Sequence, residues 1–134
     1  MAGIFDKLNL KDQREILVLD APASFEKELK GLKGVRIERR AATTGQVAFA
    51  IAFVTEKSEL DRVSKALAAK AKGDAVLWFA YPKGTSKALT CDFNRDSGWD
   101  VIRAAGFDTV RQVAIDADWS ALRFRRLEFI SRRG

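Results

Sequence analysis

The sequence predicts an α/β domain built on a mostly parallel, doubly wound sheet. Apolar runs of strand length, at 16–19, 47–54 and 75–80, alternate with segments of helical periodicity. These three runs are apolar without interruption, which is typical of strands covered by helices on both faces. The last two strand-like runs are separated only by residues 116–120, a gap that allows a hairpin and forbids a helical crossover.

The amino-terminal third contains a strand, a helix and a second strand. "EILVLDAP" places the first strand at 16–19. Phe25, Leu29 and Leu32 then fall on one face of a helix. Segment 35–38 alternates apolar and charged residues, which indicates an edge strand with one solvated face.

The central third is the most apolar part of the chain. Run 47–54 is followed by Thr55, which we expect to cap the helix that carries Leu60, Val63 and Leu67. Run 75–80 is the next buried strand. The two runs should be neighbours at the centre of the sheet, with their large apolar side chains buried.

The carboxyl-terminal third begins with a helix and ends with the hairpin. We expect the helix over 94–106, with Asn94 or Asp96 as its cap. In the last run, Leu122 and Phe124 have the opposite parity to Leu127 and Phe129. All four cannot share one face of a regular strand, so a bulge or a strand end is expected at 125–126.

The complete pattern predicts six strands in a single Rossmann-like domain over residues 1–134. A closing antiparallel hairpin on a parallel sheet is the arrangement of the S-adenosylmethionine (SAM)-dependent methyltransferases. This chain would be a compact version that lacks one βα unit between Glu38 and Val47.

Composition excludes several classes of site. The chain has no histidine and a single cysteine, Cys91, which excludes the common zinc sites, histidine-based triads and an internal disulfide. We therefore expect no metal and favour a protein that is not an enzyme. No apolar run is long enough to cross a membrane and no secretory signal is apparent, so a cytoplasmic location is expected.

The turn after the first strand argues against a cofactor. Methyltransferases normally carry a glycine-rich turn there, whereas this chain has "LDAPAS". Pro22 removes an amide donor, and alanine adds a Cβ where close approach is wanted. Glu38 alone is weak support for a ribose contact. We expect no cofactor and no measurable SAM binding.

The candidate binding site lies at the carboxyl ends of the strands, where open α/β sheets bind ligands. "WFAYPKGTSK" leaves a central strand there, with Pro82 ending the strand. Several basic and hydroxyl side chains could surround an anion beside the next helix start: Lys83, Thr85, Ser86, Lys87 and Arg95. The alternative is a surface loop with solvated lysines.

Three further residues belong to this candidate site. Asp92 and Asp96 could act as general bases or weak metal ligands, although a helix-capping role for at least one is favoured. Trp119, in the hairpin turn, either plugs the end of the sheet or forms a wall for a ligand, and the plug is favoured.

Several segments together resemble an uncharacterised family of small bacterial proteins known as a domain of unknown function. They are "DKLNLKDQREILVLDAP", "FVTEKSEL", "LWFAYPKGTSK", "DFNRD" and "DWSALRFRR", which cover about residues 6–126. The resemblance implies a bacterial cytoplasmic origin and a Rossmann-like domain, and it nominates the strand-end loops as the shared site. It implies no catalytic residues.

These observations favour a non-catalytic binding or regulatory domain that recognises an anionic small molecule. One alternative is an enzyme acting on a phosphorylated or carboxylated substrate through Asp92, Asp96 and Lys83. Another is a nucleic-acid-associated protein that uses the arginines near the end of the chain, since the net charge is +6. Nucleic acid is possible but not favoured, because the positive charge is spread along the whole chain.

Overall fold

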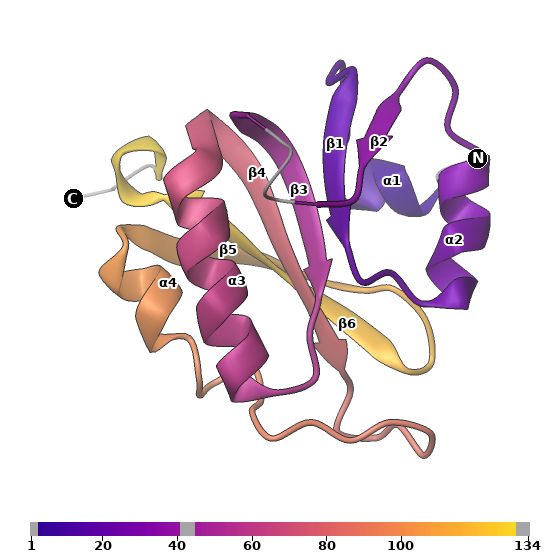
Figure 1. The fold of residues 1–134 in the computed structure, drawn as a ribbon. Coiled ribbons are helices and arrows are strands. Elements are labelled where there is room, and N and C mark those ends of the chain that lie inside the picture. Colours follow the sequence, from indigo (N-terminus) through magenta and orange to yellow (C-terminus); the bar gives the residue numbers. More distant parts are fainter. Residues whose placement is uncertain (1–2, 41–44, 131–134) are drawn as a thin grey trace.

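The computed structural model describes residues 3–40 and 45–130, which form one six-stranded sheet flanked by helices (Figure 1). The order across the sheet is β2-β1-β3-β4-β6-β5. The strands are β1 (Glu15–Leu19), β2 (Arg36–Glu38), β3 (Val47–Phe53), β4 (Ala71–Pro82), β5 (Phe107–Ala114) and β6 (Trp119–Arg126).

Strands β2, β1, β3 and β4 pair in parallel, and β6 pairs antiparallel with both β4 and β5. The predicted α/β fold, a mostly parallel sheet of six strands that ends in an antiparallel hairpin, is therefore confirmed. β2 lies at one edge, as its alternating pattern predicted, and among the described residues no strand lies beyond it.

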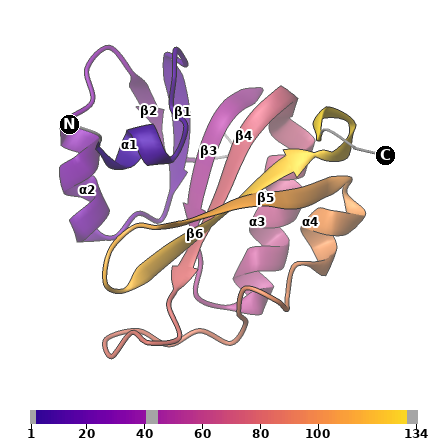
Figure 2. The ribbon, with the colours of Figure 1, turned by 180° about the vertical axis from the view of Figure 1, so that it is seen from behind.

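Helices cover both faces of the sheet (Figures 1 and 2). Two lie against one face and two against the other, and a 3-10 turn follows β6. The helices are α1 (Ile4–Lys7), α2 (Ala23–Lys30), α3 (Lys57–Lys70) and α4 (Asp100–Ala104), and the 3-10 turn is η2 (Leu127–Phe129). Within the described ranges, no helix is both long and apolar enough to span a membrane.

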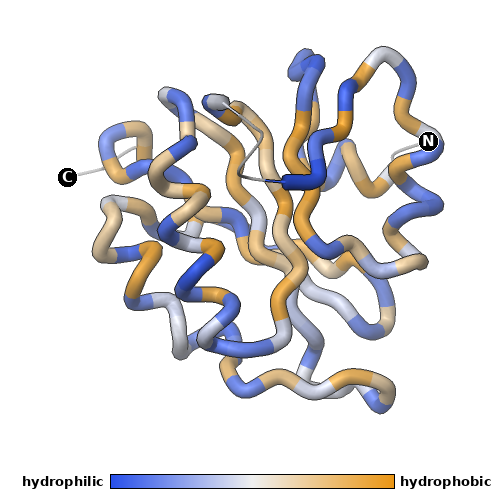
Figure 3. The backbone as a smooth tube through the Cα atoms, in the orientation of Figure 1, coloured by the Kyte–Doolittle hydropathy of each residue, from blue (hydrophilic) through white to orange (hydrophobic). Residues whose placement is uncertain are grey.

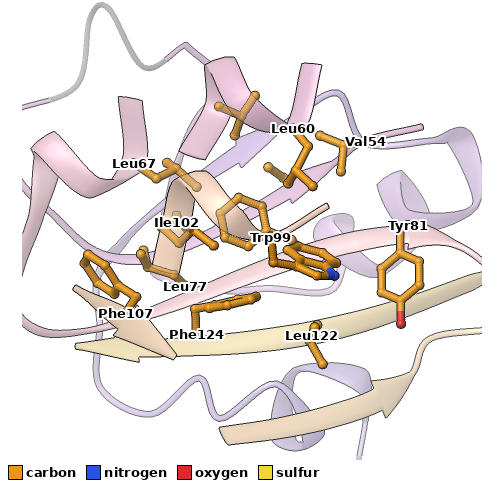
Figure 4. Close-up of a cluster of buried hydrophobic side chains, with 14 of the residues drawn as sticks. Val54, Leu60, Leu67, Leu77, Tyr81, Trp99, Ile102, Phe107, Leu122 and Phe124 are labelled. Atoms are coloured by element: carbon orange, nitrogen blue, oxygen red, sulfur yellow. The ribbon is translucent and has the colours of Figure 1, made fainter. Parts of the chain in front are cut away.

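The core consists of two clusters of buried side chains, one on each face of the sheet. Both include residues of β3 and β4, which are largely apolar along their length (Figure 3). Phe49, Ile51 and Phe53 face α1 and α2, and Leu77 and Phe79 face α3 and α4. The predicted central position of these two strands is confirmed. Figure 4 shows the cluster under α3 and α4, with Tyr81 at its end.

The helix predicted at 94–106 is shorter than expected, and its predicted caps are wrong. Asn94 Oδ1 accepts hydrogen bonds from the Asp96 amide and the Ser97 hydroxyl, which closes a local turn instead. Gly98 has φ of +100°, a conformation that cannot continue a helix. Helix α4 therefore begins only at Asp100.

Two other local predictions have different outcomes. Helix α3 begins one residue later than expected, with Glu56 rather than Thr55 at the N-cap. Strand β6 ends at Arg126, as the parity change predicted, and Leu127 and Phe129 turn outward in η2. Of the two expected alternatives, a bulge and a strand end, the structure therefore has the strand end.

Candidate functional site

The main cavity of the described residues lies at the carboxyl end of β4, under the long loop that connects β4 to α4. Its volume is about 1050 Å³, at the upper end of the range for small-molecule sites. Six of the eight predicted site residues line it: Lys83, Thr85, Ser86, Asp92, Arg95 and Asp96. The sequence therefore located the loop that forms the cavity.

Two predicted site residues do not line this cavity. Lys87 is exposed on the loop. Trp119 is buried on the other face of the sheet, where its ring packs edge-on against Phe53 with 5.1 Å between centroids. The structure therefore places Trp119 in the core, in the plug position that was favoured, and outside this cavity.

Ser86 and Asp92 hold the loop in place. The Ser86 hydroxyl donates to Asp118 Oδ1 at 2.8 Å and accepts from the Leu89 amide at 3.1 Å. Asp92 Oδ1 accepts from the Lys57 amide at 2.6 Å, which satisfies a free donor at the start of α3. A capping role for Asp92 is therefore confirmed, on the preceding helix rather than the following one.

Three of the four charged residues that line the cavity, Asp92, Arg95 and Asp96, are exposed, and Lys83 is half-buried. Arg95 Nη1 donates to Gln112 Oε1 at 3.1 Å, and Arg95 Nε lies 3.6 Å from Asp96 Oδ1. Lys83 is tied to the hairpin turn through its backbone amide, which donates to the Asp118 carbonyl at 2.8 Å. The helix start that was expected beside these residues is displaced, because α4 begins only at Asp100, after the local turn at Asn94.

Deeper in the cavity is a polar group that the sequence analysis did not identify. Gln112 Nε2 donates to the Tyr81 hydroxyl at 3.3 Å and to the Ser120 hydroxyl at 3.1 Å. Tyr81 and Ser120 are only 4% and 5% exposed, and burial raises the pKa of Tyr81 above its ordinary value. The sequence contained one signal for this group. Ser120 is at alternate positions with Leu122 and Phe124, so it lies on the same buried face of the last strand.

Cys91 also lines the cavity, but its environment does not favour a thiolate. Burial raises the pKa of the Cys91 thiol, and the charge of Asp92 raises it further. A neutral thiol is a poor nucleophile.

A second feature of the carboxyl edge is the turn between β1 and α2. β1 lies between β2 and β3, so the chain direction across the sheet reverses beside it, and this is the switch point of the fold. Asp20 has φ of +55°, the left-handed conformation usually occupied by glycine. The Ser24 hydroxyl, at the start of α2, donates to Asp116 Oδ2 of the hairpin turn at 3.5 Å.

No family model and no curated protein matches the chain in sequence, but solved structures match its fold. A SAM-dependent methyltransferase from Aquifex aeolicus superposes with a TM-score of 0.59 at 15% identity, covering 91% of this chain and 87% of that one. The chain has the fold of the SAM-dependent methyltransferases.

Two other solved structures match the fold of this chain with similar TM-scores. Magnesium protoporphyrin IX methyltransferase from Synechocystis PCC 6803, with bound SAM, gives a TM-score of 0.59 at 11% identity over 92% of this chain and 74% of that one. The [4+2]-cyclase SpnF gives 0.55 at 12% identity over 92% and 79%. Identities this low establish the fold alone.

The comparison corrects the functional interpretation drawn from the sequence. The prediction of a non-catalytic domain for an anionic small molecule was wrong, because the structures that match this fold include several SAM-dependent methyltransferases, and the one from Synechocystis was solved with SAM and with S-adenosylhomocysteine. The alternatives, a phosphorylated or carboxylated substrate and nucleic acid, are not favoured either. The reasoning failed because it treated the lack of one glycine-rich turn as evidence against the whole function.

Proposed function

We propose that this chain is a SAM-dependent methyltransferase, with the cofactor at the β1–α2 turn and the methyl acceptor in the cavity under the β4–α4 loop. The observation that carries the proposal is the match to a SAM-dependent methyltransferase over about nine tenths of both chains. SAM, when bound, supplies an electrophilic methyl group on a sulfonium. The protein's task is then to hold the two molecules in contact.

The residues of the β1–α2 turn fit this cofactor in shape. Asp20 takes the left-handed conformation without glycine, so the backbone makes the tight turn that leads directly into α2. Its neighbours Ala21 and Ala23 have the smallest side chains after glycine, which limits the loss of space. Ala23 is also the first residue of α2, whose free amides face the turn.

The charges at the turn also fit. SAM carries a sulfonium and an ammonium group, and carboxylates are suitable partners for both. Asp20 is exposed, and no described residue forms a hydrogen bond or ion pair with its carboxylate. Glu38, at the end of the adjacent strand β2, pairs with Arg36 through Oε1 at 2.6 Å, and a carboxylate has further lone pairs for a ribose hydroxyl.

One departure from the usual turn remains. Pro22 has no amide hydrogen, so the backbone offers fewer donors to the cofactor than a glycine-rich turn does. We expect this loss to reduce affinity rather than to abolish binding. The proposal therefore replaces the earlier expectation that no cofactor binds. A bacterial cytoplasmic setting, which the family resemblance implies, remains part of the proposal.

Calorimetric titration with SAM and S-adenosylhomocysteine (SAH) tests the cofactor site. We expect binding by the wild type and a loss of about tenfold or more in Asp20→Lys, equal to about 1.4 kcal/mol. Asp12→Lys is the matched control, since Asp12 is also exposed but precedes β1 at the opposite edge of the sheet. No binding by the wild type, or equal binding by Asp20→Lys, would refute the proposed site.

A further inference from the structure

The polar group formed by Tyr81, Gln112 and Ser120 contains one hydrogen-bond donor that has no acceptor within the group. Gln112 gives one amide hydrogen to each hydroxyl oxygen, and its own Oε1 is occupied by Arg95, which fixes the orientation of the amide. The two hydroxyl groups also contact each other, so one can donate to the other. If one hydroxyl donates its hydrogen to the other, the hydrogen of the second hydroxyl has no acceptor within the group.

The remaining hydroxyl hydrogen belongs to a residue that is more than nine-tenths buried. Among the described residues, the Tyr81 and Ser120 oxygens have no hydrogen-bond partners besides Gln112 and each other. Both residues line the cavity. Since an unmet buried donor costs free energy, an oxygen atom of a ligand placed there would remove that cost.

The surroundings indicate what else the ligand must have. The centroid of the Phe93 ring lies 5.9 Å from that of the Tyr81 ring, and Phe93 contributes an apolar side chain to the lining of the same cavity. A tyrosine hydroxyl is neutral at physiological pH at its ordinary pKa of about 10, and burial raises the pKa of Tyr81 further. Of the four charged residues that line the cavity, Asp92, Arg95 and Asp96 are exposed and Lys83 is half-buried, so most of the formal charge lies toward the mouth of the cavity.

We infer that the cavity recognises a planar, uncharged organic molecule that presents a hydrogen-bond-accepting oxygen to the Tyr81–Ser120 hydroxyl pair. The ring of the molecule would lie against Phe93. The identification of this molecule as the methyl acceptor rests on the proposed function, whereas its recognition by the hydroxyl pair does not.

The test uses two aromatic probes of similar size, acetophenone and ethylbenzene, titrated into the protein without SAM and followed by NMR. Only acetophenone has an oxygen acceptor. We expect acetophenone to bind about three- to tenfold more tightly, the effect of one net hydrogen bond, and to shift the side-chain amide signals of Gln112. Equal affinity of the two probes, or binding of neither, would overturn the inference.

Variants test whether the two hydroxyl groups cause the preference for acetophenone. Tyr81→Phe and Ser120→Ala keep the apolar packing but each remove one hydroxyl, and the double variant should lose the preference for acetophenone. Ser58→Ala, an exposed hydroxyl on α3, is the control and should keep it. A double variant that keeps the preference would contradict the inference.

The outcome is separable from that of the cofactor experiment. Failure of SAM to bind, with the acetophenone preference intact, would refute the proposed function and leave the hydroxyl pair as a ligand site. Binding of SAM with no acetophenone preference would refute this inference alone.

Discussion

The two connections at the carboxyl edge of the sheet are built in different ways. The β1–α2 turn has three residues, Asp20–Pro22, and its shape follows from one left-handed residue and one proline. The β4–α4 loop runs from 83 to 99, and side-chain bonds to distant elements, including Asp92 to α3 and Ser86 to the hairpin turn, hold it in place. A short turn is thus fixed by its own backbone, whereas a long loop depends on the rest of the fold.

The largest effect should come from removing a side chain in the core beneath this edge. Phe53 is 3% exposed and its ring contacts Phe25 and Trp119 with centroids 4.9 and 5.1 Å apart. Phe53→Ala should lower the free energy of unfolding by about 3–5 kcal/mol. Chemical denaturation measures this, with the exposed Val110→Ala expected to change stability by less than about 0.5 kcal/mol. A loss close to that of the control would show that the ring is not buried.

Gly98→Ala tests how far the long loop depends on its backbone conformation, as distinct from its side-chain hydrogen bonds. Gly98 has φ of +100°, and an added Cβ would lie 2.9 Å from Phe93 Cβ. We expect a loss of about 1–3 kcal/mol from backbone strain. Gly84→Ala, in the same loop but with open space around it, is the control. Equal thermal melting of the two variants would contradict the described loop conformation.

Asp92→Ala tests the bond between the long loop and α3. Loss of the Asp92 acceptor leaves the Lys57 amide without its partner, so we expect a loss of about 1 kcal/mol, as for other helix caps. Asp92→Asn keeps an acceptor oxygen and should recover most of it. If both variants match the wild type in denaturation, the loop is not anchored in this way.

The smallest effect should come from the opposite edge, where Arg125 forms two hydrogen bonds to Asp74. The bond to Arg125 lowers the pKa of Asp74, so its stabilisation is present above the unfolded pKa of about 3.9 and is lost as pH falls through the lower folded value. Because the pair is partly exposed, we expect less than about 1 kcal/mol. Asp74→Asn should remove this part of the acid dependence, and an unchanged pH profile would contradict it.

The fold could be predicted because it depends on local pattern. The unbroken apolarity of 47–54 and 75–80 marked central strands, and the short gap at 116–120 required a hairpin. The position of the cavity loop followed, because the carboxyl end of β4 must lie at the ligand-binding edge. Neither step required knowledge of contacts between distant residues.

The interior of the cavity could not be predicted in the same way. The contact between Gln112 and Tyr81 joins two strands that are not neighbours in the sheet, since β6 lies between them. The use of Asp92 by α3 depends on how the loop returns toward that helix. Trp119 was uncertain between core and ligand because sequence alone does not say on which face a turn residue packs.

The most direct test of the proposed cofactor site is a crystal structure of the protein grown with saturating SAH. The account predicts SAH at the carboxyl end of β1, with its ribose beside Glu38 and its amino acid group beside Asp20 and the start of α2. The cavity lined by Tyr81 and Ser120 would remain open to the acceptor. Crystals with no SAH, or with SAH bound only in that cavity, would contradict the account.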